Sequence, residues 1–258
     1  MPARLFSIAT NTFRETVRNK VLYAILAFAL FVIGMTNFLA DISVGELTRI
    51  IADVGLASIH VFGVVMAVFL GISLVSREIE RKTVFIILSK PVHRWEFVVG
   101  KALGLSMTLA ITTSVMAILL FLVHAGYRFG GAAEPGIFIA SAGIYMELVL
   151  LVCVASLFSS FTTPVLSAIF TLSVFLIGHI TRDLLFFGGR SGSGAVRLTA
   201  KAIYYILPNL EYFNLKNGVP HGEIRTASLL AAPAAYLVCY GAAVLFFASI
   251  IFSRKDFK

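Results

Sequence analysis

Six long apolar segments alternate with polar ones along the chain. They cover residues 21–40, 54–75, 102–123, 137–158, 163–181 and 227–252. A helix needs roughly 20 apolar residues to cross the hydrocarbon of a bilayer, because every backbone polar group has to be satisfied within the segment. The pattern therefore predicts six transmembrane helices, with Pro233 able to bend the last one without ending it.

A short amphipathic helix is predicted ahead of the first apolar segment, over residues 1–20. Its apolar positions recur every four residues and its charged positions lie elsewhere around the helix: Leu5, Ala9, Phe13 and Val17 against Arg14, Glu15 and Arg18. Such a helix lies on a membrane surface with its apolar face towards the lipid. The alternative is a solvated tail. The apolar segment that follows is too long for a signal peptide and predicts a permanent first span.

Composition places the whole chain in one membrane domain, residues 1–258, of the all-α polytopic class. Of 258 residues, 59% are hydrophobic and only 13% are charged, which is far from the composition of a soluble domain. The formal net charge of +8 is typical of basic cytoplasmic loops, so we expect no nucleic-acid partner. Both cysteines, Cys153 and Cys239, lie in apolar runs and indicate neither a disulfide framework nor a metal site.

The distribution of Lys and Arg predicts that both termini are cytoplasmic. Basic residues concentrate before the first span, over residues 77–101 and after the last span, as the positive-inside rule requires. Residues 182–226 then form an external loop, although this loop carries six basic residues and departs from the rule. Its aromatic residues, Tyr204, Tyr205, Tyr212 and Phe213, have the spacing of interfacial or re-entrant helices before the sixth span.

The segment between the second and third spans, residues 76–101, combines dense charge with an apolar patch. Arg77, Glu78, Glu80, Arg81 and Lys82 suit a helix that projects from the bilayer, residues 84–88 offer a surface to bury, and Pro91 ends the helix. Such a surface can dock a soluble partner. A solvated loop with cytoplasmic basic residues explains the charge equally well, so charge alone leaves both interpretations open.

Several motifs in this region resemble one family. The run from Arg77 to Thr83, followed by Leu-Ser-Lys-Pro at 88–91, Arg-Trp-Glu-Phe at 94–97 and Gly-Lys at 100–101, resembles the loop between spans two and three of ABC-2 type permeases. The most similar group includes gliding-motility and nitrous-oxide-reductase maturation exporters. Residues 11–23, 159–164 and 207–214 extend the resemblance, in the same order, over most of the chain.

The resemblance implies a membrane subunit of an ATP-driven ABC exporter in a bacterial or archaeal plasma (inner) membrane. Two such subunits, more simply a homodimer than a heterodimer, would work with two copies of a separate ABC ATPase. An N-terminal elbow helix, a cytoplasmic coupling helix and re-entrant helices before span six would complete the fold. The residues that dock the ATPase would be Arg77, Glu78, Ile79, Glu80, Arg81, Lys82, Thr83, Phe85, Leu88, Ser89 and Pro91. The turn at residues 159–163 would add a smaller contact.

The sequence indicates no catalytic chemistry of its own. Residues 188–194 are rich in glycine but lack the lysine of a phosphate-binding loop, and no metalloprotease motif is present. We therefore expect a non-enzymatic subunit that binds no cofactor, while ATP and Mg²⁺ are used by the partner ATPase.

Three polar residues inside the spans need an explanation. Glu147 lies in the fourth span and is either a pathway residue or a carboxyl hydrogen-bonded to a neighbouring helix, the interpretation we favour. His60 and His179 have no second ligand nearby in sequence, so we interpret them as packing residues and predict no metal site. A proton-coupled secondary transporter that uses Glu147, or a membrane anchor for an ATPase, is the alternative to the exporter. The cargo is not indicated.

Overall fold

The structure, a computed structural model, describes residues 2–41, 47–80, 94–127, 136–190, 193–218 and 226–254. Over these ranges the chain forms helices and no β-strand. Five of the described helices are long and apolar enough to cross a membrane, and there are six crossings if the bent pair α1–α2 counts as one span. The predicted all-α polytopic fold is therefore confirmed.

The described part of the chain forms eight α-helices: α1 (Pro2–Val17), α2 (Lys20–Asp41), α3 (Leu47–Glu80), α5 (Arg94–Tyr127), α6 (Gly136–Ser159), α7 (Pro164–Arg190), α8 (Gly194–Ile206) and α9 (Ala231–Arg254). All except α1 and α8 centre on the six apolar segments. Three short 3₁₀ helices, η1 (Leu210–Phe213), η2 (Lys216–Gly218) and η3 (Ala227–Leu230), lie between α8 and α9. Helix α7 is longer than the predicted span, residues 163–181, because it continues to Arg190 and packs against α8, so residues 182–190 of the expected external loop are helical.

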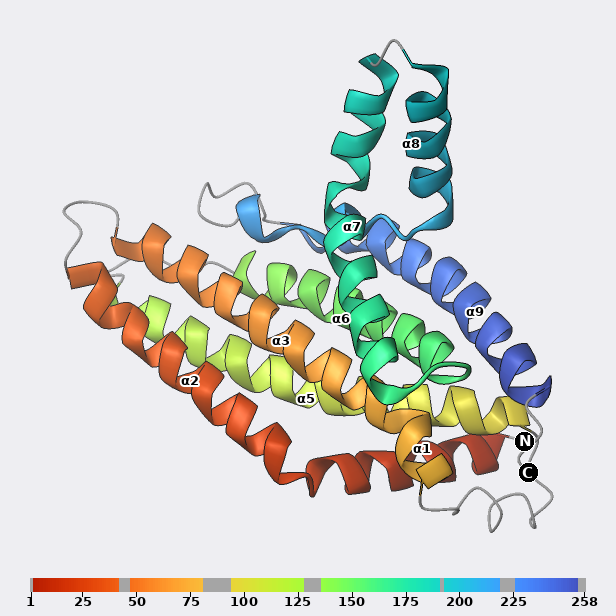
Figure 1. Ribbon diagram of the computed structural model, residues 1–258. Helices are drawn as coiled ribbons and strands as arrows, with labels where there is room; N and C mark the ends of the chain where they lie inside the picture. The colour runs from red at the N-terminus through yellow and green to blue at the C-terminus, as the bar shows by residue number, and fades with distance from the viewer. Residues whose placement is uncertain are drawn as a thin grey trace.

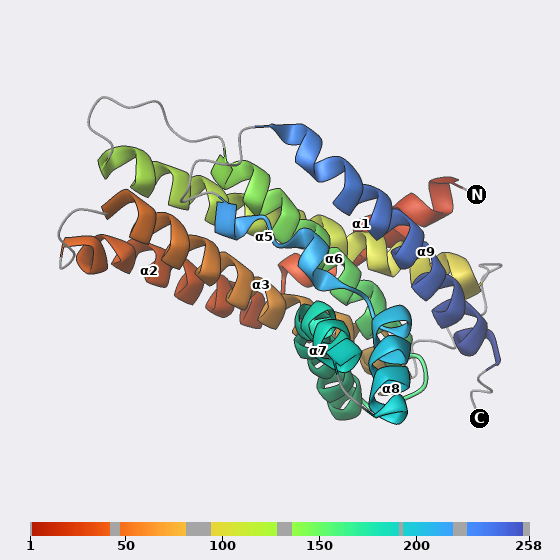
Figure 2. The same ribbon diagram turned by 90° about the horizontal axis from the view of Figure 1, so that it is seen from above.

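Helices α3 and α6 form the centre of the molecule. They pack on each other, and most of the residues in their apolar spans are buried, whereas α7 and α9 lie further out. Figures 1 and 2 show α2, α3, α5 and α6 running side by side, with α9 along one flank and the α7–α8 hairpin projecting from the bundle. The beginnings of α1 and α5 and the ends of α3 and α9 lie at one end of the molecule, which we call the α1 end (Figure 1).

The chain bends sharply between α1 and α2. The two helices meet at 66°, and Asn19 lies at the bend. The Asn19 side-chain oxygen accepts a hydrogen bond from the Val21 backbone N–H at 3.1 Å, as an N-cap residue does, so α2 starts anew instead of continuing α1. This bend allows α1 to leave the direction of the span and to lie across α5.

Helix α1 packs on α5 through small residues. A Cβ at Gly104 of α5 would lie 2.5 Å from the backbone oxygen of Ala9 and 2.7 Å from the Cβ of Thr12, so only glycine allows this approach. The buried face of α1 is centred on Ala9, Thr12 and Thr16, and the Thr16 hydroxyl donates to the Thr12 carbonyl oxygen. The predicted apolar stripe therefore forms only part of the buried face, because close packing on glycine selects small side chains.

Replacing Gly104 with alanine is expected to destabilise the protein by about 1–3 kcal/mol, because backbone atoms of α1 have no room to yield to the new Cβ. Fluorescence-detected thermal unfolding of the purified protein measures the effect. Gly126→Ala on the same helix is the matched control, since a Cβ there would meet no atom within 4 Å. Equal unfolding temperatures for the two variants would contradict the close packing of α1 on α5.

Candidate functional site

The predicted ATPase-docking residues fall into two groups. Arg77, Glu78, Ile79 and Glu80 belong to the last turn of α3, at the α1 end of the molecule. The remaining seven lie outside the described residues: Arg81, Lys82, Thr83, Phe85, Leu88, Ser89 and Pro91. Their docking role remains a prediction. The helical backbone over residues 77–80 shows that the charged segment begins as a direct extension of a central span.

Arg94 is the first residue described after Glu80, and it joins the beginning of α5 to the end of α9. Its Nη1 donates to the backbone oxygens of Phe252 at 3.3 Å and Ser253 at 2.8 Å. The last carbonyl groups of a helix have no partner within the helix, and a guanidinium group satisfies them and complements the helix dipole. Phe97 stacks on Phe252 one turn further along, with ring centroids 5.8 Å apart. Helices α5 and α9 are therefore held together at the α1 end.

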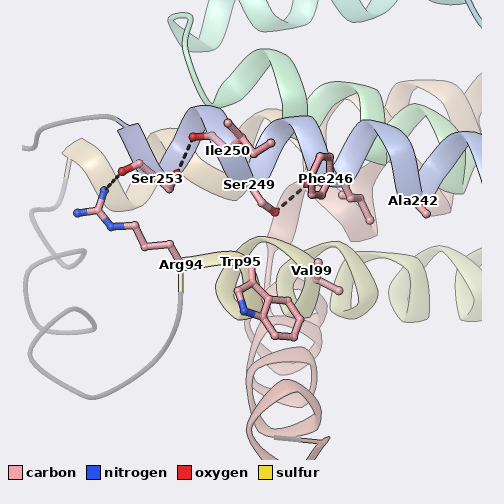
Figure 3. A pocket seen from close by; sticks show the side chains of 9 residues that line it. Arg94, Trp95, Val99, Ala242, Phe246, Ser249, Ile250 and Ser253 are labelled. Carbon is pink, nitrogen blue, oxygen red and sulfur yellow. Dashed lines mark hydrogen bonds between the residues drawn. The ribbon is translucent and has the colours of Figure 1, made fainter.

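An apolar groove lies beside this contact. It has a volume of about 730 Å³, and Figure 3 shows its walls formed by Trp95 and Val99 of α5 and by residues of α9 such as Phe246 and Ile250. Arg94 and Ser253 lie at its polar end, with the hydrogen bond between them drawn in Figure 3. Apart from this end, the lining is mostly apolar and suits a hydrocarbon chain.

The turn between α6 and α7 is compact. The hydroxyl groups of Ser160 and Thr162 donate to backbone oxygens of α6, and Pro164 begins α7, where its missing N–H costs no helix hydrogen bond. Phe161 at the tip is about half exposed. Residues 159–163 therefore form a short turn. Their contact with an ATPase remains a prediction.

A re-entrant segment fills the space between α6, α7 and α9. Leu210 and Phe213 of η1 are fully buried. A Cβ at Gly143 of α6 would lie 2.8 Å from the backbone oxygen of Phe213. A Cβ at Gly178 of α7 would lie 2.9 Å from the backbone oxygen of Pro208, so both glycines make room for this backbone. The motif at residues 207–214 is thus the one that lets a non-helical chain enter the helix bundle.

Side chains of α9 hold this segment in place. The Tyr236 hydroxyl accepts a hydrogen bond from the Asn209 backbone N–H at 2.9 Å, and the Tyr240 hydroxyl donates to the oxygen of Ile206 at 2.9 Å. The ring of Tyr212 stacks on that of Tyr236, with centroids 5.2 Å apart. These contacts position η2, which follows directly and carries Lys216.

Four polar side chains from different parts of the chain meet next to η2. Glu147 of α6 is 2% exposed, and the Nε2 atom of His60 on α3 lies 3.0 and 3.1 Å from its two carboxylate oxygens. The Nε2 atom of His179 on α7 lies 3.5 Å from the Glu147 Oε1 atom. Lys216 completes the group, with its Nζ 3.0 Å from the His60 Nδ1 atom. We call these four residues the buried polar cluster.

The hydrogen bonds assign a tautomer to each imidazole. An ammonium group has only donors, so Lys216 donates to Nδ1 of His60, whose Nε2–H then donates to Glu147. His179 uses its Nδ1–H to donate to the backbone oxygen of Phe175 at 3.1 Å. Its Nε2 faces Glu147 and makes no hydrogen bond within the described part of the chain, and in the neutral imidazole this atom carries the lone pair.

The cluster resolves two points that the sequence left open. Glu147 is hydrogen-bonded to a neighbouring helix, as we favoured. His60 and His179 are not isolated: their ring centroids are 5.5 Å apart, and Phe175 packs against both. Long sequence separations concealed this proximity, and the only available signal was that each residue lies near the middle of its own span. Lys216, one of the basic residues that depart from the positive-inside rule, contacts the imidazole of His60, which in turn bonds the buried carboxylate of Glu147.

Together these features define a polytopic helical membrane protein with a separate helix packed on α5 at its beginning and a buried non-helical segment before its last long helix. The family model described as ABC-2 family transporter protein matches residues 6–257, so the chain belongs to this family and is a permease component of an ABC transporter. Membership implies an ABC ATPase as partner. No curated protein matches the chain significantly.

Removing the guanidinium of Arg94 is expected to loosen the end of α9. In Arg94→Met the carbonyl groups of Phe252 and Ser253 lose their donor, so the last turn of α9 frays and its amides exchange faster. Hydrogen–deuterium exchange of peptides covering residues 245–254 measures this. Arg254→Met is the control, because Arg254 is exposed. If Arg94→Met left the amide exchange rates of these peptides unchanged, the contact between Arg94 and the α9 carbonyl groups would not be what holds the end of α9.

Removing the charge of Glu147 is expected to destabilise the protein. Glu147→Gln leaves Lys216 without a nearby buried counter-charge and costs about 1–3 kcal/mol, less than breaking a fully buried ion pair because Lys216 is only half-buried. Adding Lys216→Met should restore part of the loss. Thermal unfolding of both variants tests this, with Asp53→Asn as the control for loss of an exposed carboxylate on α3. A double variant less stable than Glu147→Gln alone would contradict the charge compensation.

Proposed function

We propose that this chain is the membrane-spanning subunit of an ATP-driven exporter of the plasma membrane. Two copies would form the translocation pathway, and two ABC ATPase subunits would bind ATP and Mg²⁺ and hydrolyse ATP. Family membership supports the ATPase partner, and the apolar helices support the membrane location. Export as the direction and a homodimer as the assembly follow from the similarity of the sequence motifs to ABC-2 exporters.

In this proposal the α1 end of the molecule is cytoplasmic. The observation that carries the function is that α3 ends at Glu80 and α5 begins at Arg94 at that end, so both helix ends belong to the charged segment, residues 76–101. Its docking residues would be Arg77, Glu78, Ile79, Glu80, Arg81, Lys82, Thr83, Phe85, Leu88, Ser89 and Pro91. A surface with charges of both signs and an apolar patch is suited to a groove on a soluble protein.

The contacts of α5 supply a route from the docked ATPase to the membrane. Movement of the charged segment would reach α1 through the close packing at Gly104 and α9 through Arg94. It would also reach the centre of the bundle directly, since the segment continues α3. Closure of the ATPase dimer could thereby change the arrangement of several spans at once, which is what coupling ATP hydrolysis to transport requires.

The buried polar cluster supports a second candidate, a proton-coupled transporter. Ionisable groups inside membrane spans often carry protons, and Glu147 lies between two histidines. This candidate requires transport without an ATPase. It therefore makes a different prediction about what the purified chain binds and about whether transport in vesicles needs ATP.

Reversing the charge at Glu78 and Glu80 is expected to weaken binding of the ATPase. The double variant Glu78→Lys, Glu80→Lys should insert normally but co-purify with much less ATPase, because the acidic groups no longer meet basic residues of the partner. Quantitative co-purification from the native membrane in mild detergent measures this, with Glu15→Lys on the exposed face of α1 as the control. An unchanged yield of the complex would reject the docking assignment, and absence of any ATPase with the unaltered protein would favour the proton-coupled candidate.

A further inference from the structure

The buried polar cluster contains a set of metal ligands, although no metal-binding motif is present in the sequence. His60, Glu147 and His179 each offer one ligand atom, and these three atoms lie within 4.8 Å of one another. Two imidazoles and one carboxylate are a common donor set for Zn²⁺ and related divalent transition metals. We propose that these three residues bind a divalent transition-metal cation of the Zn²⁺ type.

The distances between the ligand atoms are close to those that a metal would impose. Atoms bound to Zn²⁺ at about 2.0–2.1 Å in a tetrahedron are about 3.3 Å apart. The Nε2 atom of His60 lies 3.0 and 3.1 Å from the Glu147 oxygens, and the Nε2 atom of His179 lies 3.5 Å from Oε1. Metal binding also requires the Nε2 proton of His60 to be lost or replaced by one on Nδ1, which frees the Nε2 lone pair. Small side-chain rotations would then complete three positions of the tetrahedron, leaving the fourth for water or another ligand.

His179 is already arranged as a metal ligand. Its Nδ1–H donates to the Phe175 backbone oxygen, so in the neutral imidazole the Nε2 lone pair points at Glu147. This is the usual arrangement of a metal-binding histidine, whose second nitrogen donates to a carbonyl or carboxylate. A lone pair and a carboxylate oxygen 3.5 Å apart repel each other. A cation between them turns this repulsion into two coordinate bonds.

Three helices hold the ligands in place. His60 lies near the middle of the apolar part of α3 and Glu147 near the middle of α6, while His179 comes from α7. Both His60 and Glu147 are more than nine-tenths buried. Because packed helices change their spacing less readily than loops, the site is largely formed before a metal arrives.

Lys216 competes with the metal for His60. Its ammonium group occupies Nδ1 of His60 and brings a positive charge to the side of the imidazole opposite Glu147. A dication at Nε2 of His60 repels this ammonium group, so the Lys216 side chain has to leave when the metal binds. The proposal therefore makes an unusual prediction, that removal of a residue from the cluster strengthens binding.

Metal binding is tested on the full-length chain, purified without a histidine tag, stripped with chelator and kept in detergent or lipid nanodiscs. Equilibrium dialysis with Zn²⁺ should show one ion per chain, and Co²⁺ should give the visible absorption of a tetrahedral site. His179→Phe and Glu147→Gln should each weaken binding at least about tenfold. His124→Gln is the control, because His124 lies on α5 outside the cluster.

The variant Lys216→Met distinguishes a metal site from an ion-pair network. The metal proposal predicts tighter Zn²⁺ binding in this variant than in the unaltered protein. Absence of stoichiometric Zn²⁺ and Co²⁺ binding to both proteins would overturn the proposal and leave the cluster as an internal ion pair. Binding that persists in His179→Phe and Glu147→Gln would also overturn it, since the metal would then lie elsewhere. None of these outcomes depends on the ATPase, so the proposed exporter function is tested separately.

Discussion

A lipid bilayer offers no hydrogen-bond partner to a peptide group, and this constraint explains the most unusual part of the molecule. The long helices satisfy their backbone internally, but the chain from Leu207 to Gly218 is not a continuous helix. It enters the bundle only where protein supplies what lipid cannot: the Tyr236 and Tyr240 hydroxyl groups bond its backbone, and Gly143 and Gly178 give it space. The sixth span thus serves both as a membrane helix and as a support for the segment before it.

The same constraint applies to charge. A carboxylate near the middle of a span is costly unless it is paired, and Glu147 is surrounded by His60, His179 and, through His60, Lys216. The partner that brings a full positive charge comes from the re-entrant segment. Folding of that segment and burial of Glu147 therefore depend on each other, which gives a structural reason for a lysine at this point of the chain.

Much of the fold could be predicted from the sequence because hydropathy and helix length are local properties. The spans, the surface helix before the first of them and the re-entrant region before the last follow from runs, periodicity and aromatic spacing. The buried face of α1 was less predictable, since it depends on Gly104 in a distant helix. The polar cluster was not predictable, because its members are separated by dozens of residues and only the packing of α3, α6 and α7 brings them together. Charge patterning indicated residues 76–101 as a docking segment, but which of its residues bind a partner depends on the surface of the partner chain.

The seam between α1 and α5 has a mechanical consequence. Helices that touch through glycine and small side chains have no compressible layer between them, so neither can slide past the other by exchanging rotamers. The two must tilt as one rigid body. Because the 66° bend at Asn19 joins α1 to α2, a tilt of this joined pair would also change the direction of α2.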